Sequence, residues 1–301
     1  GALAAGSARE RNAESCAARG SFARDGCAAE KGGRAPGGGS DMNATRRACG
    51  KGAQGGKGMT DERAWIAEYI EAFAAARGFV LPPSAPALFA RYAAFLLEQN
   101  EKMNLTALKT PRAVADGHFL DSLAPVAMGL IADGSRIIDV GCGPGLPGLP
   151  LRFALENSDV TLVDSQQKRV RFMEAFITGA GLDGAHPVCA RAEVLAADAA
   201  FREQFDAAVS RAVAGLPVLC ELCLPFVRVG GVMLAYKGRG AREEADVARG
   251  AMAALGGRLL RVENAGLAGE QDGHCIIIVE KTAQTAKIYP RKYAKITKNP
   301  L

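Results

Sequence analysis

The feature of this sequence that most restricts its fold is an alternation of short β-rich runs with helical segments between residues 136 and 281. Strands that alternate with helices in this way predict a parallel, doubly wound sheet. The short turn-rich gap between the last two runs indicates an antiparallel hairpin. The seven predicted strands are residues 136–140, 159–164, 185–190, 205–210, 231–237, 257–263 and 274–281. We therefore expect an α/β protein with a mostly parallel, Rossmann-like sheet of seven strands that ends in an antiparallel hairpin.

The roughly seventy residues before the first strand have a helical pattern instead. One helix with the expected apolar periodicity ends at Gly78. Ser84 can cap a second helix that runs to about Gln99, and a third helical region follows Pro111. Residues 59–131 are therefore predicted to form a helical N-terminal region.

The two ends of the chain differ from its middle in composition. Gly and Ala supply 28 of the first 58 residues, so residues 1–58 are predicted to be a disordered basic extension. Residues 282–301 contain five Lys or Arg and no acid, which predicts a basic C-terminal arm. Basic arms suit a polyanion such as RNA, although a solvated tail is an equal alternative for the N-terminal extension. We expect the C-terminal arm to contact RNA phosphate and the diluted N-terminal charge to contribute little.

The remaining composition excludes several classes of protein. With 49% apolar residues the chain can bury a sizeable core, yet it has no apolar run long enough to span a membrane. It lacks the apolar stretch of a signal peptide, so a cytoplasmic protein without a membrane partner is expected. Cys220 and Cys223 lie in an apolar helical run, which favours buried thiols over a zinc site. We expect no metal and a monomer.

A loop rich in glycine and proline follows the first predicted strand, where residues 139–150 are DVGCGPGLPGLP. In open α/β sheets, ligands bind beyond the carboxyl ends of the strands. Gly143, Gly145 and Gly148 match the G-x-G-x-x-G pattern of dinucleotide sites, and Asp164 stands where a ribose-binding carboxylate is expected. A nicotinamide-dependent enzyme is therefore one possible interpretation.

Two features favour S-adenosylmethionine as the ligand of this loop. Pro144 and Pro147 remove backbone N–H donors that a pyrophosphate requires, whereas S-adenosylmethionine has no phosphate. Asp139 precedes Gly141, and its carboxylate can meet the cationic end of this cofactor but would repel pyrophosphate. Asp164 can accept hydrogen bonds from both ribose hydroxyls, although it could instead cap the next helix. The cofactor residues predicted from the pattern itself are Asp139, Gly141, Gly143, Gly145 and Asp164.

Several motifs together identify a family. The loop and the following LVDSQQKRVRFM resemble the RsmG (GidB) family of bacterial 16S rRNA guanine-N7 methyltransferases. So do the motifs KMNLTAL, HFLDSL, SRAVA, YKG and YPRKYAKITKNPL, in this order, over about residues 60–301. The resemblance implies an S-adenosylmethionine-binding methyltransferase domain at residues 132–281 and a substrate in 16S rRNA of the small ribosomal subunit. It also implies cofactor contacts at Gly141, Leu146, Ala192, Glu193 and Arg211.

Arg211 can also be assigned from its position. It follows the fourth predicted strand, so it is expected at the ligand-binding edge of the sheet. A structural ion pair is the alternative interpretation for this side chain.

The chemistry implied by the resemblance requires no general base. Guanine N7 carries a lone pair and no proton in the neutral base, so we nominate no catalytic acid or base. Catalysis is expected from alignment of the reactants and from a site that tolerates a cationic product. The guanine must be exposed or flipped to be reached. The residues predicted to hold it are Asn104, His118, Asp121 and Lys237.

Three other functions remain open at this point. A methyltransferase for a small molecule or a protein would use the same fold, but the basic C-terminal arm argues against it. A nicotinamide-dependent oxidoreductase would need a Tyr-x-x-x-Lys pair or a catalytic histidine on a second domain, and neither is visible. An RNA-binding module without turnover would not require the intact pattern of Gly141, Gly143, Gly145 and Asp164.

Overall fold

The computed structural model describes residues 59–265 and 273–301. The predictions for residues 1–58 lie outside this part of the chain. Within it, no helix is both long enough and apolar enough to cross a lipid bilayer.

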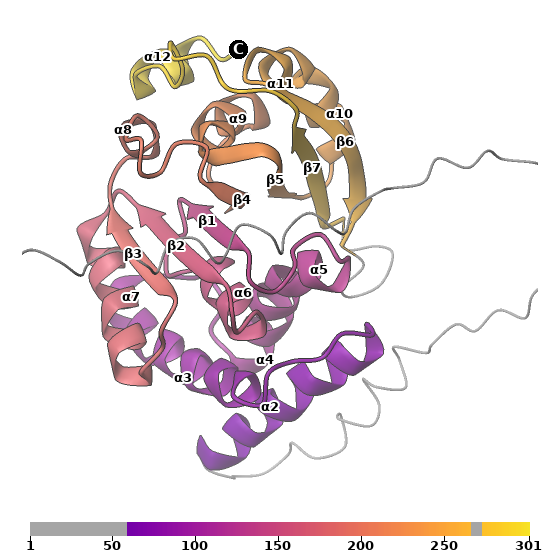
Figure 1. Cartoon of the computed structure of the whole chain (residues 1–301). Coiled ribbons are helices and arrows are strands. Elements are labelled where there is room, and N and C mark those ends of the chain that lie inside the picture. Colours follow the sequence, from indigo (N-terminus) through magenta and orange to yellow (C-terminus); the bar gives the residue numbers. More distant parts are fainter. Residues whose placement is uncertain (1–58, 266–272) are drawn as a thin grey trace, which may run out of the picture. The chain divides into compact units, whose positions relative to one another are not determined.

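The seven predicted strands form a single sheet in the order β3-β2-β1-β4-β5-β7-β6 (Figure 1). The first five strands pair in parallel, and β7 inserts antiparallel between β5 and β6. The mostly parallel sheet with an antiparallel hairpin at its end is thus confirmed. The strands are β1 (Arg136–Val140), β2 (Asp159–Asp164), β3 (Ala185–Cys189), β4 (Phe205–Arg211), β5 (Val227–Lys237), β6 (Gly257–Asn264) and β7 (Cys275–Lys281).

The strand β5 begins four residues earlier than the sequence pattern predicts. Gly230 and Gly231 suggest a break in the sequence, but the strand continues through them. Gly230 has a φ of 85°, and the pairing of β5 with β4 shifts register between Phe205 and Ala207. The glycine pair is therefore accommodated within the strand as an irregularity of the ladder.

Helices cover both faces of the sheet, as a doubly wound fold requires (Figure 1). Successive residues of β1 enter different cores, with Ile137 on one face and Ile138 on the other. The first core includes side chains of α6 (Gly148–Ala154), α7 (Gln167–Ala180) and the N-terminal helices. The second core includes side chains of α8 (Ala192–Leu195), α9 (Leu216–Cys223), α10 (Ala241–Val247), α11 (Arg249–Ala254) and α12 (Tyr293–Lys298), with the 3-10 turn Leu224–Phe226.

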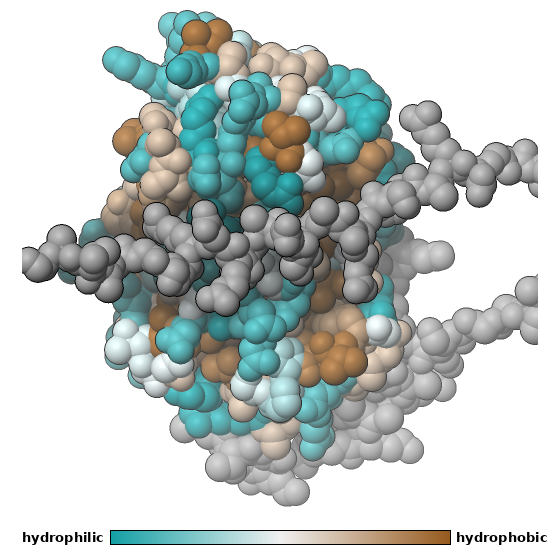
Figure 2. Space-filling view, viewed as in Figure 1, coloured by the Kyte–Doolittle hydropathy of each residue, from teal (hydrophilic) through white to brown (hydrophobic). Residues whose placement is uncertain are grey.

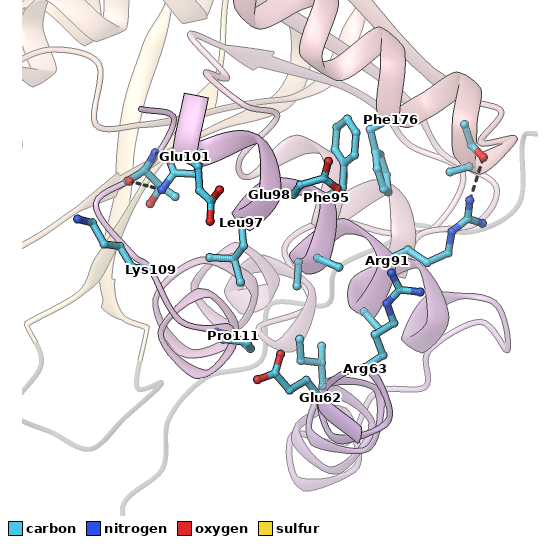
Figure 3. Close-up of a pocket in the computed structure, with 18 of the residues that line it drawn as sticks. Glu62, Arg63, Arg91, Phe95, Leu97, Glu98, Glu101, Lys109, Pro111 and Phe176 are labelled. Carbon is cyan, nitrogen blue, oxygen red and sulfur yellow. Dashed lines mark hydrogen bonds between the residues drawn. The ribbon is translucent and has the colours of Figure 1, made fainter. Parts of the chain in front are cut away.

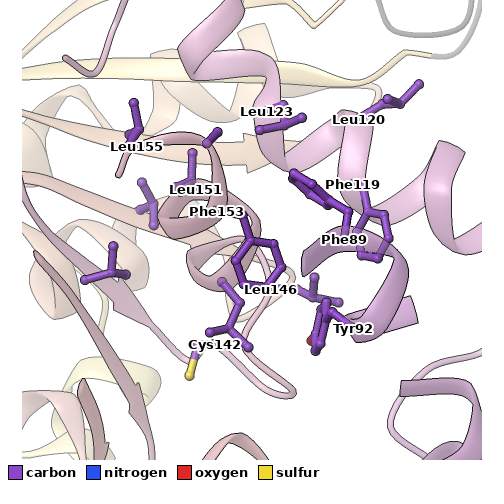
Figure 4. Close-up of a cluster of buried hydrophobic side chains, with 14 of the residues drawn as sticks. Phe89, Tyr92, Phe119, Leu120, Leu123, Cys142, Leu146, Leu151, Phe153 and Leu155 are labelled. Atoms are coloured by element: carbon purple, nitrogen blue, oxygen red, sulfur yellow. The ribbon is translucent and has the colours of Figure 1, made fainter. Parts of the chain in front are cut away.

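The N-terminal helices share the core of the sheet domain instead of forming a separate one. They are α2 (Met59–Ala76), α3 (Ala85–Met103), α4 (Pro111–Val114), the π-helix η1 (Ala115–Leu120) and α5 (Asp121–Ala127). Phe89 and Tyr92 of α3 pack against Phe119 of η1 and Phe153 of α6 (Figure 4). These rings fix the helical region against α6, the helix that follows the glycine-rich loop.

The helix α3 is longer than predicted, since it continues to Met103. It ends where Asn104 adopts a left-handed conformation with a φ of 52°, a conformation that asparagine tolerates better than most residues. The end of this helix therefore places the loop after Asn104 beside η1, where the first polar contacts of the site begin.

The CxxC pair behaves as predicted. Cys220 and Cys223 are buried in α9, and burial raises the pKa of Cys220 to about 12. Neutral thiols of this kind are packing residues. Among the described residues, no three His, Cys, Asp or Glu side chains converge in a way that could hold a metal ion.

Candidate active site

The glycine-rich loop between β1 and α6 pairs its backbone donors within the protein. Each N–H that exists between Gly141 and Leu149 donates to a protein oxygen. Pro144 and Pro147 have no N–H to donate. The bonds run from Gly141 and Cys142 to the Val163 carbonyl, from Gly145 and Leu146 to the Cys142 carbonyl, from Gly143 to Asp164, from Gly148 to Asp139 and from Leu149 to the Gly145 carbonyl, at 2.7–3.1 Å.

These hydrogen bonds distinguish between the two ligands that the glycine pattern allows. A pyrophosphate binds to unpaired N–H groups in the loop and at the start of the following helix. Here those N–H groups already have partners, and the start of α6 is held by Asp139. The nicotinamide-dependent alternative therefore loses the donors that its cofactor requires, whereas a ligand without phosphate loses nothing.

The glycines give the loop its close fit to its neighbours. Gly141 has a φ of 73°, and a Cβ there would lie 2.5 Å from Val213, which follows β4. Gly145 has a φ of 99°, and a Cβ there would meet Leu149 at 2.6 Å. Side chains other than hydrogen are therefore disfavoured at both positions. At Gly143, by contrast, a Cβ would project into open space.

Asp139 lies beneath the loop and is fully buried. Its Oδ2 accepts the hydrogen bond from Gly148 N at 2.7 Å. Its Oδ1 is the one buried side-chain nitrogen or oxygen in the described part of the chain that has no hydrogen-bond partner. Burial raises the pKa of Asp139 to about 7. An unpaired buried acceptor is unfavourable unless a ligand completes it, so this oxygen is a candidate contact for a cationic group.

Asp164 at the end of β2 has the helix-start role that was the alternative to ribose binding. Its Oδ1 accepts from Gln166 N at 2.8 Å, just before α7, and its Oδ2 accepts from Gly143 N at 3.0 Å. Arg169 also donates to Oδ2 at 3.1 Å, and its side chain is 41% exposed. These bonds use three of about four lone-pair positions on the carboxylate. A bidentate contact with a ribose therefore requires Arg169 to move away.

A second group of polar residues lies on the face of the sheet that carries the N-terminal helices. Arg211 at the end of β4 donates through Nη1 to Asp121 Oδ2 at 2.7 Å. Its Nη2 lies 3.3 Å from His118 Nδ1, and His118 Nε2 lies 2.7 Å from Thr106 Oγ1. His274 Nδ1 lies 3.1 Å from the other oxygen of Asp121. These five side chains, Thr106, His118, Asp121, Arg211 and His274, are called the Arg211 cluster below.

The charges in the Arg211 cluster determine its protonation. Burial and the Arg211 cation lower the pKa of His118 to about 4, so this ring is neutral at physiological pH. Because a guanidinium can only donate, His118 Nδ1 must accept, and the proton lies on Nε2 toward Thr106. Burial favours the neutral form of Asp121, but the bond from His274 and the Arg211 charge outweigh it and lower the pKa.

The sequence predicts His118, Asp121 and Arg211, but it does not predict their partners. Thr106 is held in place by Asn100, which exchanges two bonds of 2.9 Å with its backbone. Tyr92 of α3 donates to the Pro144 carbonyl at 2.6 Å and so ties the helical region to the loop. Thr106 lies in the KMNLTAL motif, and His274 is the first residue of the last predicted strand. A sequence signal therefore existed for both segments, but not for these two residues.

Comparison with known proteins assigns the chain to a family. The family model described as GidB, rRNA small subunit methyltransferase G, matches residues 86–272. The chain belongs to this family. A curated relative named Ribosomal RNA small subunit methyltransferase G, from Moorella thermoacetica, is 38% identical over 77% of this chain and 97% of the relative. A relative of the same name from Geobacillus thermodenitrificans is 40% identical over 78% of this chain and 99% of its own length.

Among solved structures, a TehB-like SAM-dependent methyltransferase from Corynebacterium glutamicum aligns with a TM-score of 0.41 and 19% identity. The alignment covers 57% of this chain and 94% of that one. This likeness is too slight to support an argument about the site.

The remaining predicted site residues lie at separate points of the fold. Leu146 is buried in the loop, and Ala192 and Glu193 begin α8 immediately after β3. Lys237 ends β5, but its ammonium donates to Ala214 O and Glu244 Oε1, both at 2.8 Å. Asn104 is exposed at the end of α3. Asn104 and Lys237 are therefore not part of the Arg211 cluster.

A groove of about 900 Å³ lies elsewhere in this GidB-family chain, between α2, α3 and α7 (Figure 3). Its apolar floor includes Phe95 and Phe176, and its rim carries both carboxylates and cations. Asn104 and Thr106 lie at one end of it, but neither the glycine-rich loop nor Arg211 lines it. The residues with the chemistry of a cofactor site converge at the strand ends, so the candidate active site is there and not in this groove.

Proposed function

We propose that this protein is an S-adenosylmethionine-dependent methyltransferase that modifies N7 of a guanosine in the 16S rRNA of the small ribosomal subunit. The names of its family and its relatives support small-subunit rRNA as the substrate. The one structural observation on which the cofactor assignment rests is the loop in which every backbone N–H from Gly141 to Leu149 is paired, above a buried carboxylate with one unpaired oxygen.

The residues of the loop fit the two ends of this cofactor. Asp139 would accept a hydrogen bond from the cationic amino acid end through its unpaired Oδ1. Asp164 would accept from the ribose hydroxyls once Arg169 releases it. Ala192 and Glu193 would border the adenine, and Leu146 would line the loop side. Arg211 would add a cation near the carboxylate of the cofactor.

The reaction requires no proton transfer. When bound, S-adenosylmethionine supplies a methyl group that is activated by its sulfonium charge. The N7 lone pair forms the new C–N bond as the C–S bond breaks, and the electron pair of that bond remains on sulfur. Guanine gains one positive charge, and no proton leaves N7. The protein therefore contributes alignment and an environment that accepts a cation.

The Arg211 cluster is the proposed place for the guanine. His118 is neutral, so it adds no positive charge where the methylated base becomes cationic. Asp121 provides a carboxylate whose two oxygens are already aimed by Arg211 and His274. Asn104 and Lys237 remain proposed contacts, but they lie outside the cluster, so we expect their replacement to weaken RNA binding less.

The test is transfer of a labelled methyl group to 30S subunits and to naked 16S rRNA, followed by mapping of the modified base. Incorporation at guanine N7 in either substrate supports the proposal. Incorporation into protein or small molecules with none in RNA would contradict it. Wild-type protein heated to unfold it provides the control for incorporation without an enzyme.

A further inference from the structure

The C-terminal segment, residues 282–301, is held along its length and is not an extended arm. The Arg202 guanidinium donates to the carbonyls of Thr285 and Tyr289 at 2.7 and 2.9 Å. Glu203 accepts from Thr285 N at 2.7 Å. Lys281, whose pKa burial lowers to about 8, lies fully buried at the start of the segment and donates to the Leu224 carbonyl at 2.7 Å.

The second half of the segment is fixed even more firmly. Arg291 donates through its backbone N, Nε and Nη2 to the fully buried Glu221 of α9, at 2.6–3.1 Å. Ile296 of α12 is also fully buried in the core that α9 forms. A helix of six residues would not be stable alone, so these contacts determine where α12 lies.

The outer surface of this docked segment combines cations with exposed apolar groups. Lys292 and Lys295 are exposed, and the segment contains no acidic residue. The Arg191 guanidinium lies over the Tyr293 ring at 5.1 Å, and 41% of Tyr293 remains exposed. Val194, one helical turn after Arg191, is 64% exposed. On the face shown in Figure 2, hydrophilic and hydrophobic side chains are mixed over the region of α8 and α12.

This surface lies beside the candidate active site. Arg191 directly precedes Ala192 and Glu193, which begin α8 at the carboxyl end of β3. The contact between Arg191 and Tyr293 brings α12 next to α8, as Figure 1 also shows. An RNA strand that presents its guanine at the carboxyl edge of the sheet would therefore have its neighbouring nucleotides within reach of this surface.

We propose that α8 and α12 form an RNA-binding shelf for single-stranded nucleotides next to the target guanosine. This inference rests on the proposed rRNA substrate. Arg191, Lys292 and Lys295 bind backbone phosphates, and the exposed part of Tyr293 stacks on a base. Cations interleaved with an aromatic ring are the combination that binds single-stranded RNA with little sequence preference. The buried contacts of Arg202 and Arg291 hold the shelf at a constant place relative to the cofactor loop.

The first test removes two charges from the shelf with the double variant Lys292→Gln/Lys295→Gln. The matched control is Arg258→Gln/Arg261→Gln, which removes two exposed cations from β6 at the other edge of the sheet. Equilibrium binding to a 16S rRNA fragment is measured against salt concentration. Two lost phosphate contacts should weaken binding about tenfold and lower the slope of log K against log salt by about 1.5. Equal behaviour of the shelf and control variants would overturn the proposal.

The second test concerns the stacking residue. Tyr293→Ala should weaken RNA binding roughly tenfold, whereas Tyr293→Phe should bind like the wild type, because every base can stack on either ring. S-adenosylmethionine affinity and the thermal midpoint should not change in either variant. Equal RNA affinity of the Ala and Phe variants would show that the ring contributes only packing. Because binding needs no turnover, a wild-type protein without rRNA methylation would refute the proposed function and leave the shelf to be decided by these affinities.

Discussion

The glycine-rich loop and the Arg211 cluster lie at the same edge of the sheet, yet they satisfy their polar groups in opposite ways. The loop pairs its backbone donors over a span of nine residues and leaves a single buried acceptor, Asp139 Oδ1, without a partner. The Arg211 cluster pairs its side chains with each other, and two bonded partners, Asp121 and His274, lie 153 residues apart in the sequence. The loop is thus a preformed cradle, whereas a ligand of the cluster must share or displace an existing bond.

The two carboxylates illustrate this difference. The pKa of Asp139 is raised to about 7 because burial outweighs the bond from Gly148 and the charge of Arg211, which does not bond to this carboxylate. Asp121 is also buried, but the bond from His274 and the Arg211 charge lower its pKa. Similar burial therefore accompanies a raised pKa for Asp139 and a lowered pKa for Asp121, and the difference is the paired cation at Asp121. Each of the following experiments replaces a residue either at the loop or in the Arg211 cluster.

The largest effect is expected from Asp121→Ala, since it leaves the largely buried Arg211 without its partner. Breaking a buried ion pair on one side should reduce the free energy of unfolding by about 4 kcal/mol. Urea unfolding at pH 7 measures it. The matched control is His274→Ala, which removes the half-exposed partner of the same carboxylate and should reduce it by less than about 1 kcal/mol. A loss below 1 kcal/mol for Asp121→Ala would mean that water replaces the carboxylate.

The next effect is expected from Asp139→Asn, and its sign depends on pH. Because the folded state raises this pKa from 3.8 to about 7, the wild type loses stability as pH rises through that range. The uncharged variant does not. Its stability relative to the wild type should therefore increase by about 3 kcal/mol between pH 4 and pH 8. Chemical unfolding at both pH values measures this, and a difference that does not change with pH would contradict the buried charge.

The same variant should bind S-adenosylmethionine at least tenfold more weakly at pH 8, since it cannot offer a charge to the amino acid end of the cofactor. Calorimetry measures this affinity. A stabilised protein with unchanged affinity would move Asp139 out of the cofactor site and leave it as the residue that holds Gly148 and the start of α6.

Most of the fold could be predicted from the sequence, because each strand is a local run with its own turn signals. The strands β1 and β2 have the predicted bounds. The insertion of β7 between β5 and β6 was not predicted, since strand order depends on which edge a hairpin joins and not on its own residues. The predicted start of β5 was wrong because the pair Gly230-Gly231 resembles a turn in the sequence, whereas the sheet accommodates it as a bulge within the strand.

The candidate site also contains local features that the sequence predicts and distant contacts that it does not. Asp139, Gly141 and Asp164 were predicted because the loop and the neighbouring strand end are close in the sequence. The engagement of Lys237 by Glu244 was missed, although the two are seven residues apart, because it depends on how α10 folds back. Thr106 and His274 could be assigned only once the structure brought Thr106 to His118 and His274 to Asp121.

A smaller effect, and one on binding alone, is expected from Asp164→Ala. The loss of charge-assisted bonds to the ribose should weaken S-adenosylmethionine binding by about 2 kcal/mol. Calorimetry on the folded variant checks this. Arg169→Ala is the informative companion, because Arg169 occupies a lone-pair position that the ribose needs. If Arg169 competes with the ribose, its removal should leave affinity equal or improved, and a tenfold loss would show that it assists binding instead.

The smallest effect is expected from His118→Gln, and it probes the neutral side of the Arg211 cluster. The fold lowers the pKa of His118 from 6.5 to about 4, so the unfolded chain binds a proton more readily between these values. The wild type should therefore lose stability as pH falls from about 6.5 toward 4, by about 1 kcal/mol for a side chain that is only partly buried. Glutamine can accept from Arg211 and donate to Thr106 without titrating, so the free energy of unfolding of the variant should change less with pH in this window.

At saturating substrates, the methyl-transfer rate of both proteins should show no ionisation near pH 6–7, since N7 loses no proton. If His118→Gln abolished single-turnover transfer while RNA and cofactor affinity stayed unchanged, the histidine would act in the chemical step and the base-free mechanism would be wrong.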